Sequence, residues 1–272
     1  MKYGLCVDQE MLSKMMDYTN TDFDYFELYF SNIAKMSDDN FKSWLKHSKR
    51  ILEKIETVIF RIPPVYNIHY SETNFNLALN YAYRSTRMAA QIGAKLIVIG
   101  SGDARAIPSF ISANTGYNNL IRFFSKLSLE AYFYGINIAI EPLAKCYCPT
   151  INTIRESIEL LKVLRQYSSI SNTYMIIDNH HMHMNKEDLS DIGLAHDYLC
   201  HIHLRNPNLQ TYPDFKDGYD YLPILKQILQ VNYNGRISLE AKPNYEKITQ
   251  AENAITFIKS LFNRLEMSKT PI

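Results

Sequence analysis

The sequence has little glycine and proline, and its net charge is close to zero. Its 272 residues include 9 Gly and 10 Pro, and 29 Lys plus Arg oppose 28 Asp plus Glu, for a formal charge of +1. This composition excludes collagen-like and low-complexity chains, and 46% hydrophobic residues exclude disorder. A charge of +1 creates no overall field that would draw the chain to DNA, RNA or an anionic bilayer. We therefore expect no nucleic-acid partner.

Paired cysteines and long apolar segments are also missing. Of Cys6, Cys146, Cys148 and Cys200, only the middle two are close together, and this C-x-C lacks the second pair of a structural zinc site. We interpret all four as free thiols. The start, MKYGLCVDQE, lacks the basic and apolar regions of a secretion signal, and no run approaches the roughly 20 apolar residues that span a bilayer. We expect a cytoplasmic protein with no membrane partner.

What the sequence does contain is an alternation of short apolar, β-branched runs and longer amphipathic segments. Eight runs are predicted strands, at 3–7, 25–30, 57–62, 95–100, 136–141, 173–178, 199–204 and 236–240. Helical periodicity is clearest at 75–92, 118–134, 151–167 and 248–265. No linker divides the chain, so we predict one α/β domain spanning 1–272, a (β/α)8 TIM barrel. A doubly wound open sheet is disfavoured because the first βα turn, VDQEML, lacks the glycines of a dinucleotide loop.

Acidic residues and histidines lie at the ends of the last four predicted strands. The fifth strand ends at Glu141, the sixth at Asp178 and the eighth at Glu240, and the seventh carries His201 and His203. In a closed barrel the C-terminal strand ends meet on one face, so these side chains would surround one point. Carboxylates together with an imidazole suit Mn²⁺, Mg²⁺, Co²⁺ or Zn²⁺. One such carboxylate is more often a helix cap, but the four positions together predict a catalytic metal site.

Histidines are numerous near these strand ends. His201 and His203 share one side of an extended strand, and we prefer His203 as the ligand because it lies nearer the loop. His201 is then a hydrogen-bonded core histidine. The cluster DNHHMHM, directly after the sixth strand, adds three more, of which we predict a substrate contact for His181 and loop positions for His180 and His183.

Five segments, in order along nearly the whole chain, carry a family resemblance. They are GSGDARAIP (100–108), IAIEPL (138–143), the D-x-x-H of 178–181, HIHL (201–204) and YNGRISLE (233–240). Together they resemble the sugar phosphate isomerase/epimerase family, within the xylose isomerase-like TIM barrel (AP endonuclease 2) superfamily. That superfamily also holds hydroxypyruvate isomerase, ketose 3-epimerases, inosose-processing enzymes and endonuclease IV.

The resemblance implies one divalent metal ion held by Glu141, Asp178, His203 and Glu240. In the isomerase and epimerase members the two glutamates also move protons at a carbon beside a carbonyl, so the implied catalytic residues are Glu141 and Glu240. His181 would hold a substrate oxygen. The implied activity is isomerisation or epimerisation of a small sugar, sugar acid or sugar phosphate through an enediolate.

The chain also departs from this family at two sugar-contacting positions. Where ketose 3-epimerases have a glutamate and an arginine, six residues after the first ligand and after the ligand histidine, this chain has Tyr147 and Leu209. The candidate replacements are the cations Arg105, Arg205 and Lys242, which suggest a carboxylate or phosphate on the substrate. Each could instead be an ordinary solvated loop residue.

Three rival functions remain open at this stage. A lyase, of the inosose or dehydroshikimate dehydratase type, would use the same metal and general base to expel a β-hydroxyl. A repair nuclease would need three zinc ions, and His69 is its only candidate ligand after the third strand. A non-catalytic binding module would have no use for four converging ligands. Dimers and tetramers are frequent in the family that the chain resembles, so a homo-oligomer is expected from that likeness alone.

Overall fold

The eight predicted strands form a closed parallel barrel. The computed structural model describes residues 1–15, 21–167, 171–241 and 248–267. Within these ranges each strand pairs with the next, and the last pairs with the first. The strands are β1 (Lys2–Val7), β2 (Tyr25–Tyr29), β3 (Ile55–Ile59), β4 (Leu96–Ile99), β5 (Asn137–Ile140), β6 (Thr173–Asp178), β7 (Leu199–Leu204) and β8 (Arg236–Leu239). The predicted (β/α)8 TIM barrel is confirmed.

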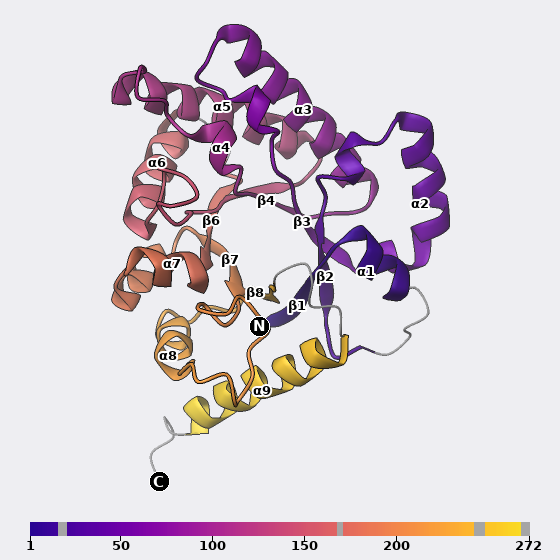
Figure 1. Ribbon diagram of the computed structural model, residues 1–272, viewed down its shortest axis with the longest axis vertical. Helices are drawn as coiled ribbons and strands as arrows, with labels where there is room; N and C mark the ends of the chain where they lie inside the picture. Colours follow the sequence, from indigo (N-terminus) through magenta and orange to yellow (C-terminus); the bar gives the residue numbers. More distant parts are fainter. Residues whose placement is uncertain (16–20, 168–170, 242–247, 268–272) are drawn as a thin grey trace.

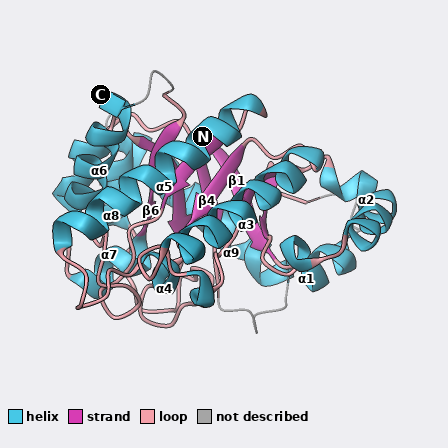
Figure 2. Cartoon of the chain, turned by 90° about the horizontal axis from the view of Figure 1, so that it is seen from above, coloured by secondary structure: helices cyan, strands magenta, loops and turns pink. Residues whose placement is uncertain are grey.

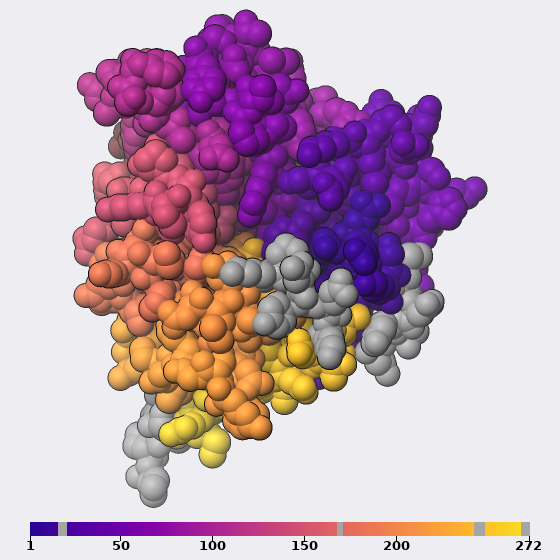
Figure 3. Space-filling view, viewed as in Figure 1, coloured from indigo at the N-terminus to yellow at the C-terminus, as the bar shows by residue number. Residues whose placement is uncertain are grey.

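Helices surround the barrel on its outside (Figures 1 and 2). They are α1 (Gln9–Lys14), α2 (Asp38–Leu52), α3 (Glu72–Gln91), α4 (Gly102–Arg105), α5 (Ala113–Phe133), α6 (Ile154–Tyr167), α7 (Asn179–Asn185), α8 (Leu222–Gln230) and α9 (Ile248–Met267), with short 3-10 turns at Ile33–Lys35, Pro64–Tyr66 and Leu189–Ala195. Successive segments follow one another around the molecule until the C-terminal part returns beside the N-terminal part (Figure 3). Among the helices described, none is long and apolar enough to cross a membrane.

Local sequence signals set the ends of the long helices. Ser71 and Ser112 accept hydrogen bonds from the backbone N–H three residues on, at the starts of α3 and α5. Gly93 and Gly135 follow the same two helices with φ of +84° and +67°, a region that favours glycine. Helix α6 begins later than predicted, because Thr153 supplies the cap by accepting the N–H of Glu156.

The strands divide the core into two layers. Along β4, Leu96 and Val98 face the barrel interior, whereas Ile97 and Ile99 pack under the surrounding helices. Both faces are buried, which explains why the strand sequences are continuous apolar runs instead of alternating ones. The same alternation places a few polar side chains inside the barrel, and these form the floor of the site described below.

Two local predictions differ from the structure. The third strand begins and ends earlier than 57–62, and its early end follows from the two prolines that lead into the 3-10 turn Pro64–Tyr66. The segment after β6 is helix α7 and not a loop, so the loop positions predicted for His180 and His183 were wrong. Asp178 starts this helix by accepting the N–H groups of His180 and His181 through Oδ1, at 2.7 and 3.4 Å.

We expect Glu187→Gln to remove part of the pH dependence of stability. Burial raises the pKa of Glu187 to about 7, although the N–H of Ile154 donates to its carboxylate at 2.6 Å. This pKa is higher in the folded state than in the unfolded chain, so the protonated Glu187 side chain stabilises the fold. That stabilisation is complete below about pH 4.5 and is lost as pH rises to about 7. The side chain is partly exposed and therefore screened by solvent, so we expect an effect of about 1 kcal/mol.

Urea denaturation of wild type and Glu187→Gln at about pH 5 and about pH 8 measures this difference. Wild type should lose more stability than the variant on going to the higher pH. Equal losses in the two proteins would contradict the assignment.

Candidate metal centre

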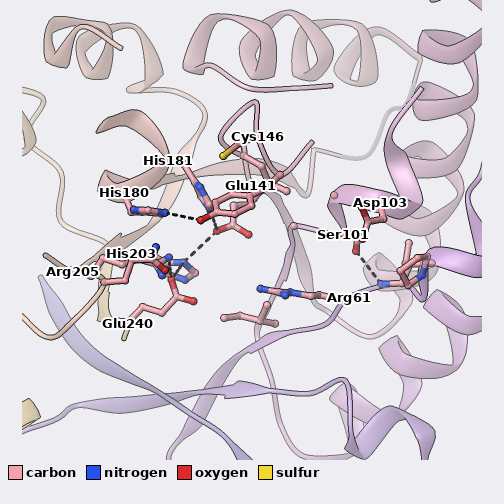
Figure 4. A pocket seen from close by; sticks show the side chains of 18 residues that line it. Arg61, Ser101, Asp103, Glu141, Cys146, His180, His181, His203, Arg205 and Glu240 are labelled. Atoms are coloured by element: carbon pink, nitrogen blue, oxygen red, sulfur yellow. Dashed lines mark hydrogen bonds and ion pairs between the residues drawn. The ribbon is translucent and has the colours of Figure 1, made fainter. Parts of the chain in front are cut away.

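A pocket of about 580 Å³ opens at the C-terminal ends of the strands. Its lining includes five of the predicted site residues: His181 in α7, His203 in β7, and Glu141, Arg205 and Glu240 directly after β5, β7 and β8. The remaining lining residues are Ile59, Arg61, Ile62, Pro64, Gly100, Ser101, Gly102, Asp103, Leu143, Cys146, Tyr147, His180 and Gln210. Figure 4 shows Glu141, Glu240 and the histidines gathered on one side of this pocket, with Asp103 on the other.

The four predicted metal ligands lie together. Donor atoms of Glu141, Asp178 and His203 are all within 4.8 Å of one another. Nδ1 of His203 lies 3.7 Å from Glu141 Oε1, 3.9 Å from Asp178 Oδ2 and 3.5 Å from Glu240 Oε2. This buried nitrogen forms no hydrogen bond within the described residues. A ring nitrogen without a partner that faces three carboxylates fits a divalent cation among mixed nitrogen and oxygen donors.

A buried glutamate on β2 fixes the orientation of His203. Glu27 is 0% exposed, and its carboxylate lies 2.6 Å from His201 Nε2 and 3.1 Å from His203 Nε2. Burial raises the pKa of Glu27, but the two imidazoles outweigh burial and hold this pKa below its ordinary range. By accepting the Nε2–H of His203, Glu27 directs Nδ1 toward the three carboxylates. A carboxylate behind a ligand histidine commonly orients the ring in metal sites.

Charge around His203 favours its protonated form in the metal-free protein. Burial lowers the pKa of His203, but Glu27 and Glu240 outweigh burial and raise it well above its ordinary value. A divalent ion would therefore replace the proton on Nδ1.

Glu141 and His181 form the wall of the pocket next to this centre. Nε2 of His181 lies 3.6 Å from Glu141 Oε1, and its Nδ1 accepts the N–H of Ala144 at 3.3 Å. Burial lowers the pKa of His181, but Asp178 and Glu141 outweigh it and raise this pKa. Gly100 leaves room for the present position of Glu141, because a Cβ at residue 100 would collide with Glu141 Oε2. His181 thus presents a polar edge at the pocket, where we expected a substrate contact.

Glu240 has two further partners. Its Oε1 accepts the hydroxyl proton of Tyr29 at 2.5 Å, and its Oε2 accepts a hydrogen bond from the guanidinium of Arg205. The same guanidinium nitrogen donates to Oδ2 of Asp178. Arg205 is only 8% exposed. Burial lowers its pKa, but Asp178 and Glu240 outweigh burial and raise the pKa above its ordinary value, so the group stays charged.

The other cations expected in the site are placed differently. Arg105 donates to the backbone carbonyls of Glu141 and Ile151, at 2.7 and 3.3 Å, and is not among the residues that line the pocket. Lys242 lies outside the described residues. His69, the nuclease candidate, bonds the carbonyl of Arg105 through Nε2 and does not line the pocket either.

Sequence reasoning overlooked two residues of the site, Glu27 and Arg61. Glu27 had a signal, because it is the one charged residue inside a predicted apolar strand, YFELYF. Arg61 had a similar but weaker signal, because it is the charged residue of the predicted strand 57–62 but stands beside the end of that strand, where arginine is ordinary. In the structure Arg61 is an exposed residue that reaches into the pocket from the side opposite Glu240 (Figure 4).

Comparisons with known proteins agree with this architecture. The family model described as xylose isomerase-like TIM barrel matches residues 19–261. A search of the curated proteins finds no match.

Three solved structures illustrate the similarity of fold. D-psicose 3-epimerase from Clostridium cellulolyticum H10, with D-tagatose, has a TM-score of 0.78 at 16% identity, covering 96% of this chain and 99% of that chain. The 3-keto-D-glucoside 4-epimerase YcjR from E. coli has a TM-score of 0.75 at 18% identity, with coverage of 96% and 99%. The IolI protein with a zinc atom has a TM-score of 0.69 at 17% identity, with coverage of 97% and 99%.

Proposed function

Because the chain belongs to the xylose isomerase-like TIM barrel family, we propose that it is a divalent-metal-dependent isomerase or epimerase of a small sugar, sugar acid or sugar phosphate. The observation that carries the proposal is Nδ1 of His203, which has no hydrogen-bond partner within the described residues and faces the carboxylates of Glu141, Asp178 and Glu240. The similar folds include sugar epimerases and one protein with zinc, which supports the proposal.

Glu141, Asp178, His203 and Glu240 would hold the ion, and their mixed donors suit Mn²⁺, Mg²⁺, Co²⁺ or Zn²⁺. When bound, the ion would supply positive charge that polarises the carbonyl and hydroxyl oxygens of the substrate and stabilises an enediolate. Glu27 would keep the His203 ring in the orientation needed for this role, through the 3.1 Å contact with Nε2.

Glu141 and Glu240 would move the proton. They extend from the ends of β5 and β8, two separate parts of the barrel wall, and so approach a bound substrate from different directions. One carboxylate removes the proton beside the carbonyl, and the other returns a proton from its own side or to the neighbouring carbon. Tyr29 holds Glu240 in place through its hydroxyl, and His181 would bind a substrate oxygen.

Metal content per chain tests the proposal directly. We expect about one ion per chain after loading, as in single-ion catalytic sites, and its loss in Asp178→Ala. Asp178→Asn should also bind the ion weakly while keeping an oxygen to cap α7, so it separates ligand loss from unfolding. Asp103→Ala is the matched control, because Asp103 lines the pocket outside the donor set.

Other outcomes have definite meanings. An undiminished metal content in folded Asp178→Ala would remove Asp178 from the site. No metal after loading with Mn²⁺ or Co²⁺ would favour a binding module, and three zinc ions would favour a nuclease. A sugar screen that scores both isomerised and dehydrated products then separates an isomerase from a lyase.

Arg61 leads us to expect a preference for an anionic substrate. Within the described parts of the chain its side chain has no ion-pair or hydrogen-bond partner, and it lies across the pocket from the proposed metal ligands (Figure 4). Acidic or phosphorylated sugars should therefore have a kcat/KM about tenfold above that of neutral analogues, and Arg61→Gln should remove that preference. Paired kinetics on matched sugars measure it, and equal kcat/KM for both classes in wild type would contradict it.

We infer a small carbohydrate as the partner of the pocket. A cytoplasmic location is part of the proposal, supported by the four free cysteines. The homo-oligomeric state expected from the resemblance stays a prediction.

A further inference from the structure

Arg205 brings a protein cation to the carboxylates that would hold the metal ion. We propose that Arg205 is a resident cation that competes with the divalent ion for Asp178 and Glu240, so that the ion binds only when the guanidinium leaves them. The inference rests on the metal site of the proposed function, and it adds Arg205 as a residue that sets the affinity of that site for the divalent ion.

The oxygen atoms that Arg205 contacts are the ones that would bind the divalent ion. Arg205 bonds Oδ2 of Asp178 and Oε2 of Glu240, and these are the two oxygens that face Nδ1 of His203, at 3.9 and 3.5 Å. A divalent ion held by that nitrogen and those oxygens would lie against the guanidinium. Because like charges at such close range repel strongly in a buried site, the two cations exclude each other.

The position of Arg205 is fixed by its surroundings. Asn179, at the start of α7, bonds the backbone of Arg205 twice, accepting its N–H at 2.9 Å and donating to its carbonyl at 2.7 Å. The side chain is held mainly at its end, because Nε has no partner within the described residues. Since Arg205 also lines the pocket, its guanidinium can leave the carboxylates for the pocket while the backbone stays in place.

Electrostatics explains what the guanidinium does when no ion is bound. Glu141 and Glu240 are each 7% exposed and Asp178 is 1% exposed, and three buried carboxylates so close together repel one another. Arg205 contacts two of these carboxylates and offsets one negative charge, so the chain itself partly neutralises the metal-free site. The consequence is a metal-free protein that stays folded and an ion that binds more weakly than its donors alone would allow.

The test measures Mn²⁺ affinity by calorimetry in wild type, Arg205→Gln, Arg205→Lys and Arg61→Gln. We expect Arg205→Gln to bind Mn²⁺ about tenfold more tightly than wild type, the usual scale of a coupling between two sites. Arg205→Lys keeps the charge and should stay near wild type. Arg61→Gln is the matched control, because it removes an arginine from the same pocket without touching the carboxylates, and its affinity should not change.

Stability gives a second readout for the same variants. Without metal, Arg205→Gln should melt at a lower temperature than wild type, because its carboxylates are unpaired, and Mn²⁺ should raise its Tm by a larger amount. Equal or weaker Mn²⁺ affinity in folded Arg205→Gln would overturn the proposal.

A measurement on wild type covers the case in which Arg205→Gln does not fold. Phenylglyoxal modifies accessible arginines, and peptide mass spectrometry reports the modified fraction of Arg205. We expect protection without metal and increased labelling with saturating Mg²⁺ or Zn²⁺. Equal protection with and without metal would overturn the proposed competition but not the metal site. Failure of every variant to bind Mn²⁺ would overturn both the metal site and the competition.

Discussion

Glu240→Gln is expected to lower kcat by roughly 10²–10⁴-fold, the range associated with loss of a general acid or base. The amide keeps the shape of the side chain and can still accept the Tyr29 hydroxyl, but it cannot take up a proton. Loss of the negative charge should also weaken metal binding, because Glu240 Oε2 lies 3.5 Å from His203 Nδ1 among the proposed donors. Steady-state kinetics and Mn²⁺ calorimetry on the loaded variant measure both effects.

Tyr29→Phe is the matched control for this prediction. It removes the 2.5 Å hydrogen bond to Glu240 but leaves the carboxylate, so kcat should fall far less than in Glu240→Gln. Equal losses in the two variants would indicate that the position of Glu240, and not its charge, limits the rate. Undiminished activity in Glu240→Gln would remove Glu240 from the mechanism.

The positions of the four proposed ligands could be predicted because barrel topology alone brings them together. Asp178 ends β6, and Glu141 and Glu240 directly follow β5 and β8. The apolar pattern had located these strands to within two residues, and a closed parallel barrel sends all strand ends to one face. The alternation of side chains then placed His203 inside the barrel. No knowledge of individual contacts was needed.

The partners of these residues could not be predicted in the same way. The contacts of Glu27 with His201 and His203 join residues 174 and 176 positions apart, and they depend on how the inner layers of the barrel align. Arg205 was expected to face a substrate, because its inward position was known but its distance from two carboxylates was not. Strand alternation gives a direction for a side chain, whereas pairing depends on three-dimensional distance.

Asp178, at the start of helix α7, has two roles. Asp178 was assigned to the metal site, and the polar cluster after it was assigned to a loop. In the structure Oδ1 of Asp178 caps α7 while Oδ2 faces His203, so one side chain both starts the helix and contributes to the site. The general preference of aspartate for helix N-caps was therefore compatible with the ligand hypothesis, and the two interpretations had been treated as alternatives.

The second large effect is expected for Glu27→Gln, which should lower the free energy of unfolding by about 3 kcal/mol, the cost of breaking a buried ion pair. Glu27 is fully buried, and no other acceptor contacts Nε2 of His201 or His203 among the described residues. Mn²⁺ affinity should fall by roughly tenfold or more, because the His203 ring loses the group that orients it. Urea denaturation near neutral pH and calorimetry measure the two effects.

The pH dependence of stability distinguishes the electrostatic role of Glu27 from a role in packing alone. The pKa of Glu27 in the folded protein lies below its ordinary value of 4.5, so its stabilisation is present above that pH and is lost as the pH falls further. The stability difference between wild type and Glu27→Gln should therefore shrink on acidification. Glu56→Gln is the control, since Glu56 pairs with Lys2 and Arg236 at a partly exposed site and should cost under about 1 kcal/mol. A Glu27→Gln protein with wild-type stability and wild-type Mn²⁺ affinity would show that the centre is oriented without this carboxylate.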